Sequence, residues 1–247
     1  MKHRALSVLL LAALCAAPLA AGEILVPLAT GTADGTTYST RIWVTNTGAT
    51  PRRWTSTFIA PGVDGTHPGA SRSLTVDPGA TIQATNLAPG DQPGILLVSG
   101  APQLLTTARL EAVGRDGALR AAVALPLVTG RQLAPAQGTL HLHGLSNKQG
   151  GLITDLQIIN AARQAAQCTV DAFRDDGARL GSTLRYSLPP RSMRSLERAL
   201  ALFGAVNVDE ARLAVSCDQA FYAQARAYKP GSGELNLVTP SRALSAP

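Results

Sequence analysis

The second half of this 247-residue chain repeats the pattern of the first half. Four pairs of segments match in the same order along the chain, with only small changes of spacing between them. The pairs are 40–46 with 154–160, 54–65 with 168–177, 74–79 with 186–191, and the region 95–112 with 211–228. The last pair brings Arg109 over Arg226. Because the order is kept, we expect an internal duplication and therefore two domains of one fold.

Three similar segments mark the beginning, middle and end of the duplicated region. They read LVPLATG at 25–31, LPLVTG at 125–130 and LNLVTPS at 235–241. We interpret them as boundary strands and expect a first domain at 23–121 and a second at 122–247. The alternative is chance, because strand-rich sequences often contain this apolar pattern.

Each copy has the pattern of an all-β domain. TRIWVTN at 40–46 alternates apolar and polar residues, as a strand with one buried face does. Asp-Gly pairs recur as turn signals at 34–35, 64–65, 116–117 and 176–177. Short strands separated by such turns predict two tandem immunoglobulin-like β-sandwich domains.

One segment of the second copy departs from the strand pattern. In residues 192–204, Leu196, Leu200 and Phe203 recur at helical spacing, and Gly204 is suited to end a helix. We therefore expect one short helix, in the second domain only.

The amino-terminal residues 1–22 resemble a secretory signal peptide. Lys2 and Arg4 precede an apolar run at 5–17, and small residues follow. The run is shorter than the roughly 20 residues that a membrane-spanning helix needs. Cys15 makes a lipid anchor the alternative. We expect cleavage near Gly22 and a periplasmic or extracellular protein with no transmembrane segment after cleavage.

The second copy resembles tandem immunoglobulin-like β-sandwich repeats of secreted bacterial proteins. The resemblance covers roughly 150–240 and is carried by TDLQIIN at 154–160, YSLPPR at 186–191, LFG at 202–204 and ARAY at 225–228. The first copy fits less well, because it lacks the L-F-G segment. Such repeats mostly have no assigned activity, so the resemblance implies a fold and export but no ligand.

Two cysteines remain beyond the signal-like segment, Cys168 and Cys217. In an exported chain such a pair predicts a disulfide. The strand alternation places both sulfur atoms in one core. Their separation resembles that of the bridge that joins the two sheets of immunoglobulin domains. The first copy has Trp54 and Gly100 at the matching positions, and we expect the indole to pack over the glycine. Two buried free thiols and an unrelated tryptophan are the alternative.

Catalytic and cofactor-binding motifs are missing. The sequence contains no G-x-S-x-G nucleophile elbow and no phosphate-binding glycine loop. His141 and His143 share one strand face, but a metal needs further ligands, and His67 lies in the other copy. The acidic pairs at 175–176 and 209–210 do not converge, because neighbouring strand residues face opposite sides. We expect a protein that is not an enzyme and has no metal and no cofactor.

Three residues are candidate ligand contacts. Trp43 lies between Ile42 and Val44 and should face outward if those two face inward. Arg109 and Arg226 occupy equivalent places in the two copies and suit an anionic or carboxylate ligand; the alternative is an exposed arginine whose stem covers apolar surface. A net charge of +6 with only 4% aromatic residues and no basic stripe argues against nucleic acid.

The sequence favours a non-catalytic binding or structural module of the bacterial cell envelope or exterior. Its partner would be an envelope or extracellular protein, or a surface polysaccharide. One alternative is a periplasmic pilus-type chaperone, which also has two immunoglobulin-like domains but would bind its client along a sheet edge. The other is a protein that binds or acts on polysaccharide, with Trp43 stacking on a sugar ring.

Overall fold

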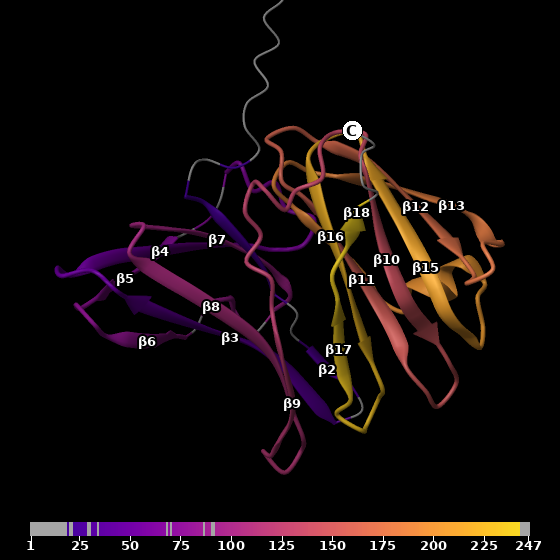
Figure 1. Cartoon of the computed structure of the whole chain (residues 1–247), viewed down its shortest axis with the longest axis horizontal. Helices are drawn as coiled ribbons and strands as arrows, with labels where there is room; N and C mark the ends of the chain where they lie inside the picture. Colours follow the sequence, from indigo (N-terminus) through magenta and orange to yellow (C-terminus); the bar gives the residue numbers. More distant parts are fainter. Residues whose placement is uncertain are drawn as a thin grey trace, which may run out of the picture.

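The computed structural model describes residues 19, 22–28, 31–33, 35–67, 69, 71–85, 87–89 and 92–242. Strands make up 58% of the structure and helical turns 3%, which confirms the all-β prediction. The strands form four antiparallel sheets, two from each half of the chain (Figure 1).

The first sandwich consists of sheets A and B. Sheet A has the strand order β1-β7-β4-β5, and sheet B has the order β2-β3-β8-β9 with β6 paired to β3. Their strands are β1 (Ile24–Leu28), β2 (Gly31–Ala33), β3 (Thr36–Asn46), β4 (Arg52–Ile59), β5 (Ser71–Val76), β6 (Thr81–Ala84), β7 (Gly94–Gly100), β8 (Leu104–Val113) and β9 (Leu119–Ala124).

The second sandwich consists of sheets C and D. Sheet C has the order β14-β11-β16-β17, and sheet D has the order β13-β12-β15-β10-β18. Their strands are β10 (Thr139–Asn147), β11 (Ile153–Asn160), β12 (Ala166–Phe173), β13 (Arg179–Leu188), β14 (Met193–Leu196), β15 (Val208–Cys217), β16 (Phe221–Tyr228), β17 (Leu235–Val238) and β18 (Ser241–Arg242).

The two sandwiches share one strand order. The run β1-β7-β4-β5 of sheet A corresponds to β10-β15-β12-β13 of sheet D, and β6-β3-β8-β9 to β14-β11-β16-β17. This agreement across both sheets supports the internal duplication. The expected domain boundary after residue 121 lies within β9, whose pairing with β8 continues to Ala124.

A buried asparagine occupies the same place in both copies. Asn46 ends β3, and its amide donates to the carbonyls of Thr50 and Val76 at 2.9 and 2.8 Å. Asn160 ends β11 and donates to the carbonyls of Gln164 and Pro189 at 2.7 and 2.9 Å. Each asparagine therefore ties the turn after its own strand to the opposite sheet. Because a buried amide needs such partners, this match is more specific than shared apolar periodicity.

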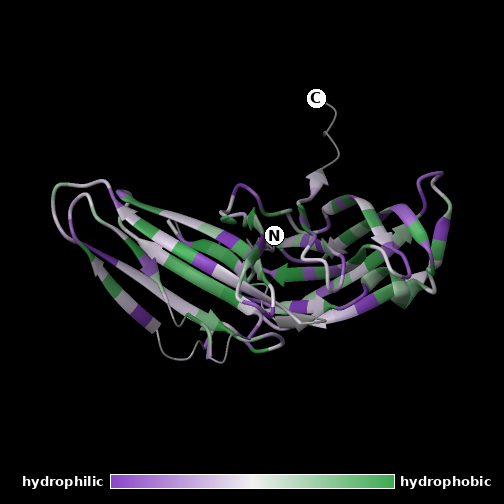
Figure 2. Ribbon diagram, turned by 90° about the horizontal axis from the view of Figure 1, so that it is seen from below, coloured by the Kyte–Doolittle hydropathy of each residue, from purple (hydrophilic) through white to green (hydrophobic). Residues whose placement is uncertain are grey.

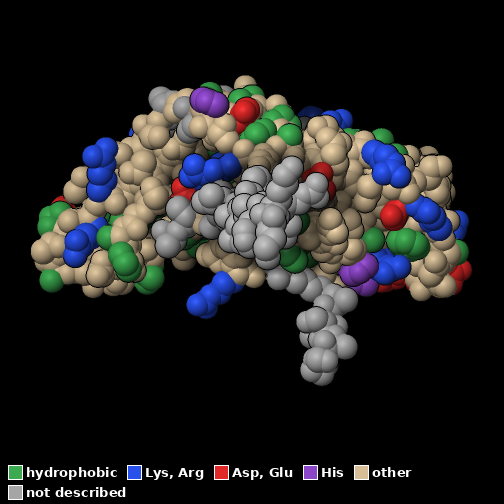
Figure 3. All heavy atoms as spheres, turned by 90° about the horizontal axis from the view of Figure 1, so that it is seen from above, with side chains coloured by type: hydrophobic (Ala, Val, Ile, Leu, Met, Phe, Trp, Pro, Cys, Tyr) green, Lys and Arg blue, Asp and Glu red, His purple; other side chains and the backbone are tan. Residues whose placement is uncertain are grey.

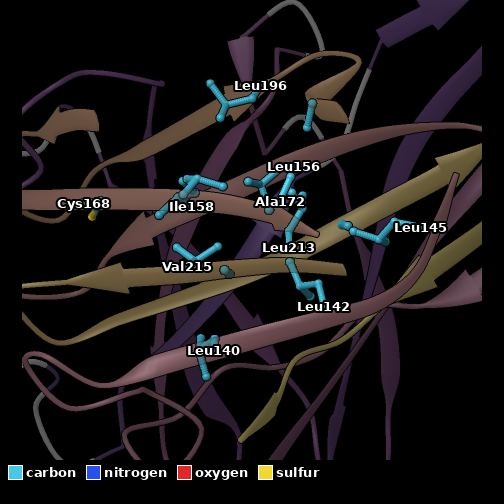
Figure 4. Packing of buried hydrophobic residues seen from close by; sticks show 14 of the residues in the cluster. Leu140, Leu142, Leu145, Leu156, Ile158, Cys168, Ala172, Leu196, Leu213 and Val215 are labelled. Atoms are coloured by element: carbon cyan, nitrogen blue, oxygen red, sulfur yellow. The ribbon is translucent and has the colours of Figure 1, made fainter. Parts of the chain in front are cut away.

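Each sandwich is filled by the inward-facing residues of its two sheets. In the second sandwich Leu156 and Ile158 of β11 lie in one buried cluster with Leu213, Val215 and other residues of sheet D (Figure 4). Hydrophobic and hydrophilic residues alternate along many of the strands (Figure 2). This alternation is the period-2 pattern from which the fold was predicted.

The expected helix over 192–204 is wrong in its first half. Met193–Leu196 form β14, which pairs with β11 from Ile159 to Leu156 and completes sheet C. Only Ala199–Phe203 are helical, as a 3₁₀ turn that ends at Gly204 with φ of 70°. Backbone pairing at the sheet edge therefore overrides the helical spacing of the leucines.

The cysteines form the predicted disulfide, but it does not join the two sheets. Cys168 on β12 and Cys217 on β15 are directly paired neighbours within sheet D, with their Cα atoms 4.1 Å apart. The immunoglobulin-type bridge between sheets was therefore the wrong comparison. Both cysteines do face the core, as their strand positions predicted.

The sandwiches pack against each other through the outer faces of sheets A and C. Leu25, Ile59 and Ile95 of sheet A form one buried cluster with residues of sheet C that include Ile159 and Tyr222. Backbone bonds cross the contact as well, such as Gly65 N–H to the carbonyl of Pro190 at 2.9 Å. The linker after β9 joins this cluster through Val128 and Leu133.

Candidate functional site

Two of the three predicted contact residues meet on the outer face of sheet B. Ile42 and Val44 of β3 are fully buried in the first core, so Trp43 between them points outward and is partly exposed. Arg109 lies on the neighbouring strand β8, where it pairs with Arg41 of β3. The guanidinium carbon of Arg109 is 4.6 Å from the centre of the Trp43 ring, in a cation–π arrangement.

The carboxylate of Glu111 fixes the two arginines of this face. Arg109 Nε donates to Glu111 Oε1 at 2.6 Å, and Arg41 Nε donates to Glu111 Oε2 at 3.3 Å. The Glu111 side chain is only 9% exposed, whereas the two arginine side chains are each 45% exposed. Leu105, further along β8, adds an apolar side chain that is 55% exposed. We call Arg41, Trp43, Leu105, Arg109 and Glu111 the Trp43 patch.

Arg226 is not part of this patch, although it is the counterpart of Arg109. On β16 it pairs with Asp155 of β11, and its Nη2 atom lies 2.5 Å from Asp155 Oδ2. Its guanidinium carbon lies 4.8 Å from the Tyr38 ring of the first sandwich and 4.7 Å from the Tyr228 ring. Arg226 therefore lies at the contact between the sandwiches, where its side chain is 15% exposed.

The contact between sandwiches also changes the two tyrosines of β16. Burial raises the pKa of Tyr228 to about 12, and the neighbouring carboxylate of Asp155 adds to the rise. Burial likewise raises the pKa of Tyr222. Both phenols therefore stay neutral at physiological pH, as expected of side chains that pack between two sandwiches.

Equivalent faces of the two sandwiches thus have different environments. All eight residues of β11 are buried. Its outer side chains include Asp155, which pairs with Arg226, and Gln157, whose Nε2 donates to the carbonyl of Leu28 in the first sandwich. The same face of sheet B carries Arg41 and Trp43 at these two positions and is partly exposed. The polar residues of TDLQIIN gave no signal that their face was buried, because alternation alone assigns such residues to solvent.

The Trp54 region contains a feature that the sequence did not predict. Trp54 pairs with Gly100 and is fully buried, and its indole donates to Thr106 Oγ1 at 3.2 Å. However, the side chain nearest to the place of a Gly100 Cβ is that of Leu104, with its Cδ1 3.1 Å away. Beside these residues lies a cavity of about 620 Å³, large enough for a small ligand or a short peptide.

The histidines and acidic pairs do not assemble a site. His141 and His143 lie on one face with their ring centres 6.1 Å apart, and burial, with help from Arg212 and His143, lowers the pKa of His141. Asp176 caps its own turn, and Asp209 bonds Ser146 and Lys148. Within the described ranges, no three His, Cys, Asp or Glu side chains lie close enough together to hold a metal ion.

The basic residues are spread over the surface. On the face seen in Figure 3, the Lys and Arg side chains are scattered between uncharged regions. Among the residues that the structure describes, no helix is long and apolar enough to cross a membrane. Neither a scan against models of known protein families nor a search of curated proteins found a match for the chain. The function therefore has to be inferred from these residues.

Proposed function

We propose that the protein is exported to the bacterial cell envelope or exterior, where it acts as a non-catalytic binding module of two immunoglobulin-like sandwiches. The signal-like residues 1–22 and the Cys168–Cys217 disulfide support this, because structural disulfides persist mainly in oxidising compartments. The partner is another envelope or extracellular protein, and it contacts the Trp43 patch.

The stacked pair of Trp43 and Arg109 carries this proposal. Trp and Arg are the residue types that most often dominate binding energy at protein interfaces. Here Glu111 and the indole already fix the Arg109 guanidinium, so little side-chain entropy is left to lose on binding. The patch offers an aromatic ring, an aliphatic side chain and two cations on one rigid sheet face.

The internal duplication favours a protein as the partner. The outer face of sheet C corresponds to the face of sheet B that carries the Trp43 patch. It already contacts the neighbouring sandwich through Arg226, whose guanidinium lies over the rings of Tyr38 and Tyr228. Moreover, the guanidinium of Arg109 covers one face of the Trp43 ring. A partner with a carboxylate or a backbone carbonyl would satisfy the remaining donors of Arg109 and Arg41.

A surface polysaccharide is the second candidate, because Trp43 is partly exposed and aromatic rings stack on sugar rings. The two candidates differ in what they require of Arg109. A sugar that stacks on the indole would gain access to the ring if Arg109 were shortened. A protein partner that bonds the guanidinium would lose affinity.

Capture with purified residues 23–247, disulfide intact, tests the proposal. Solubilised envelope proteins and a panel of surface polysaccharides are passed over wild type, Trp43→Ala, Arg109→Ala and a control, Arg212→Ala. The control removes an arginine that lies 4.4 Å over the Phe173 ring on the outer face of sheet D, so it deletes the same type of contact elsewhere. Thermal unfolding of each variant checks that it is folded.

We expect wild type and Arg212→Ala to retain one protein, and both patch variants to bind it about 30-fold more weakly or worse, as hot-spot truncation does. Retention of a polysaccharide that is lost in Trp43→Ala but kept in Arg109→Ala would establish the sugar alternative. Equal retention of the same ligand by all four proteins would place its binding away from the Trp43 patch.

A further inference from the structure

The matched strands of sheets A and D are paired in the same register. The pair of Trp54 and Gly100 in sheet A corresponds to the disulfide pair of Cys168 and Cys217 in sheet D. Counting along the strands from these pairs gives the counterparts of residues on the two outer faces. The sheet A residues that share a buried cluster with sheet C, and their counterparts on sheet D, are Leu25 with His141, Ile59 with Phe173, and Ile95 with Arg212.

The matched strands of sheets B and C share a register as well. Arg41 pairs with Arg109 in sheet B, as Asp155 pairs with Arg226 in sheet C. The outer residues of the Trp43 patch therefore have defined counterparts on the outer face of sheet C. These are Gln157 for Trp43, Tyr222 for Leu105 and Arg226 for Arg109.

All three counterparts on sheet C contact the first sandwich. Tyr222 belongs to the buried cluster that sheets A and C share. Gln157 Nε2 donates to the carbonyl of Leu28 at 3.3 Å, and the Arg226 guanidinium carbon lies 4.8 Å from the centre of the Tyr38 ring. The Trp43 patch therefore carries, on an exposed face, the positions that in the second sandwich contact a neighbouring sandwich.

A second copy of this chain does not offer the face that sheet C contacts. Each copy covers the apolar outer residues of its own sheet A with its own sheet C. Sheet D has His141 and Arg212 at two of the equivalent places, and the Arg212 guanidinium lies 4.4 Å from the ring of Phe173 at the third. A polar outer face is typical of the last unit in a stack of repeats. Sheet D therefore resembles an end, whereas sheet B has the positions of a contact.

The charges of the patch add a second requirement for its partner. In sheet C, Arg226 has the carboxylate of Asp155 on the paired strand. In sheet B the counterpart of that aspartate is Arg41, so that two arginines share the carboxylate of Glu111. Because two cations with one anion leave a positive charge at the patch, a partner with a carboxylate at this place is favoured.

We propose that the Trp43 patch binds the outer sheet face of a β-sandwich domain of a different protein, in the way that sheet C binds sheet A. That face has aliphatic side chains at the places of the three sheet A residues, and an aspartate or glutamate opposite Arg41 and Arg109. This inference rests on the proposed function, because it names the class of protein that binds at the same patch.

The test gives one copy of this chain the outer face that sheet A has. The probe is residues 23–247 with His141→Leu, Phe173→Ile and Arg212→Ile on sheet D, and with Leu105→Glu so that its own patch is blocked. It is mixed with the unchanged residues 23–247, and sedimentation velocity over a range of concentrations measures complex formation. We expect a 1:1 complex in the mixture and a monomer for each protein alone.

Matched variants of the unchanged protein show which surface binds the probe. Leu105→Glu places a carboxylate in an apolar contact and should weaken the complex at least about tenfold, as should Trp43→Ala. Leu202→Glu is the control, since Leu202 is 49% exposed in the 3₁₀ turn of the second sandwich. It should leave the affinity within about twofold. Thermal unfolding of each variant checks that it is folded.

A further variant tests the charge requirement. The sheet D face of the probe gains aliphatic side chains and no new carboxylate, so binding leaves one arginine of the patch without a partner anion. Arg41→Gln removes that charge and should tighten the complex at least about threefold. An unchanged or weaker affinity would overturn the requirement for an aspartate or glutamate.

Three results would overturn the proposed class of partner. The first is no complex between the probe and the unchanged protein. The second is a complex that Leu105→Glu in the unchanged protein does not weaken. The third is self-association of either protein alone, because a second copy would then be the occupant. If the probe does not fold, His141→Leu and Arg212→Ile without Phe173→Ile replace the three substitutions. Capture by the patch variants tests the patch itself, so a failure here with successful capture overturns only the class of partner.

Discussion

Removal of the Cys168–Cys217 bond should destabilise one sandwich more than the other. The bond closes a loop with a sequence separation of 49 residues. In the loop-entropy account, a loop of that length contributes about 4 kcal/mol to the free energy of unfolding. For a domain of roughly 100 residues, this corresponds to a fall in the melting temperature on the order of 15 °C. The pair Cys168→Ala with Cys217→Ala, or a reductant, should produce it.

The positions of the tryptophans make the effect separable. Trp43 and Trp54 both lie in the first sandwich, so their emission reports that sandwich, while far-ultraviolet circular dichroism reports all four sheets. After reduction, we expect the dichroism transition to move to lower temperature and the tryptophan transition to move less. The first sandwich has no cysteine among residues 23–121, so reduction acts on it only through the lost contact with its neighbour.

Two outcomes would refute this reasoning. If neither transition moves on reduction, the bond contributes no stability and the loop-entropy magnitude does not apply to it. If both transitions move by the same amount, the two sandwiches unfold as one cooperative unit, which contradicts two separately folding domains.

Three further predictions concern the cores and the contact between sandwiches. Trp54→Ala removes the largest fully buried side chain and should cost about 3–5 kcal/mol, measured by denaturant unfolding followed by circular dichroism. Asp155→Ala leaves Arg226 buried without its carboxylate and should cost a similar amount, about 3–5 kcal/mol in the same assay, whereas replacing both with apolar residues should cost less. The raised pKa of Tyr228 means that the folded protein keeps a phenol proton that the unfolded chain releases near pH 10. Stability should therefore fall as the pH rises from 10 toward 12, and Tyr228→Phe should reduce that slope in pH-dependent melting.

The fold could be predicted because strand alternation and turn residues are local properties. Ile42 and Val44 face the core and Trp43 faces outward, as their positions in TRIWVTN indicated. The shared order of matched segments likewise predicted the shared strand order. The cysteine pairing could be predicted because alternation along each strand indicated that both thiols face one core. That both cysteines lie in the same sheet could not be predicted, because alternation does not show which strands are neighbours.

The failures arose where distant segments decide the environment. Residues 193–196 have helical spacing, yet pairing with β11 makes them a strand. Arg226 matched Arg109 by sequence, but the first sandwich covers its face and turns it into an interface residue. No local pattern distinguishes these two arginines, because the difference lies in which face the other domain contacts.

Site-specific photo-crosslinking at Leu105 tests most directly whether the outer face of sheet B is the binding face. A photoreactive residue replaces Leu105 in one variant and Leu202 in a second, in cells that export the protein. The two leucines are 55% and 49% exposed, and Leu202 lies in the 3₁₀ turn of the second sandwich, away from the Trp43 patch. We expect one crosslinked partner from position 105 that disappears with Arg109→Ala, and none from position 202. The same partner crosslinked from position 202 and not from 105 would contradict the proposed binding face.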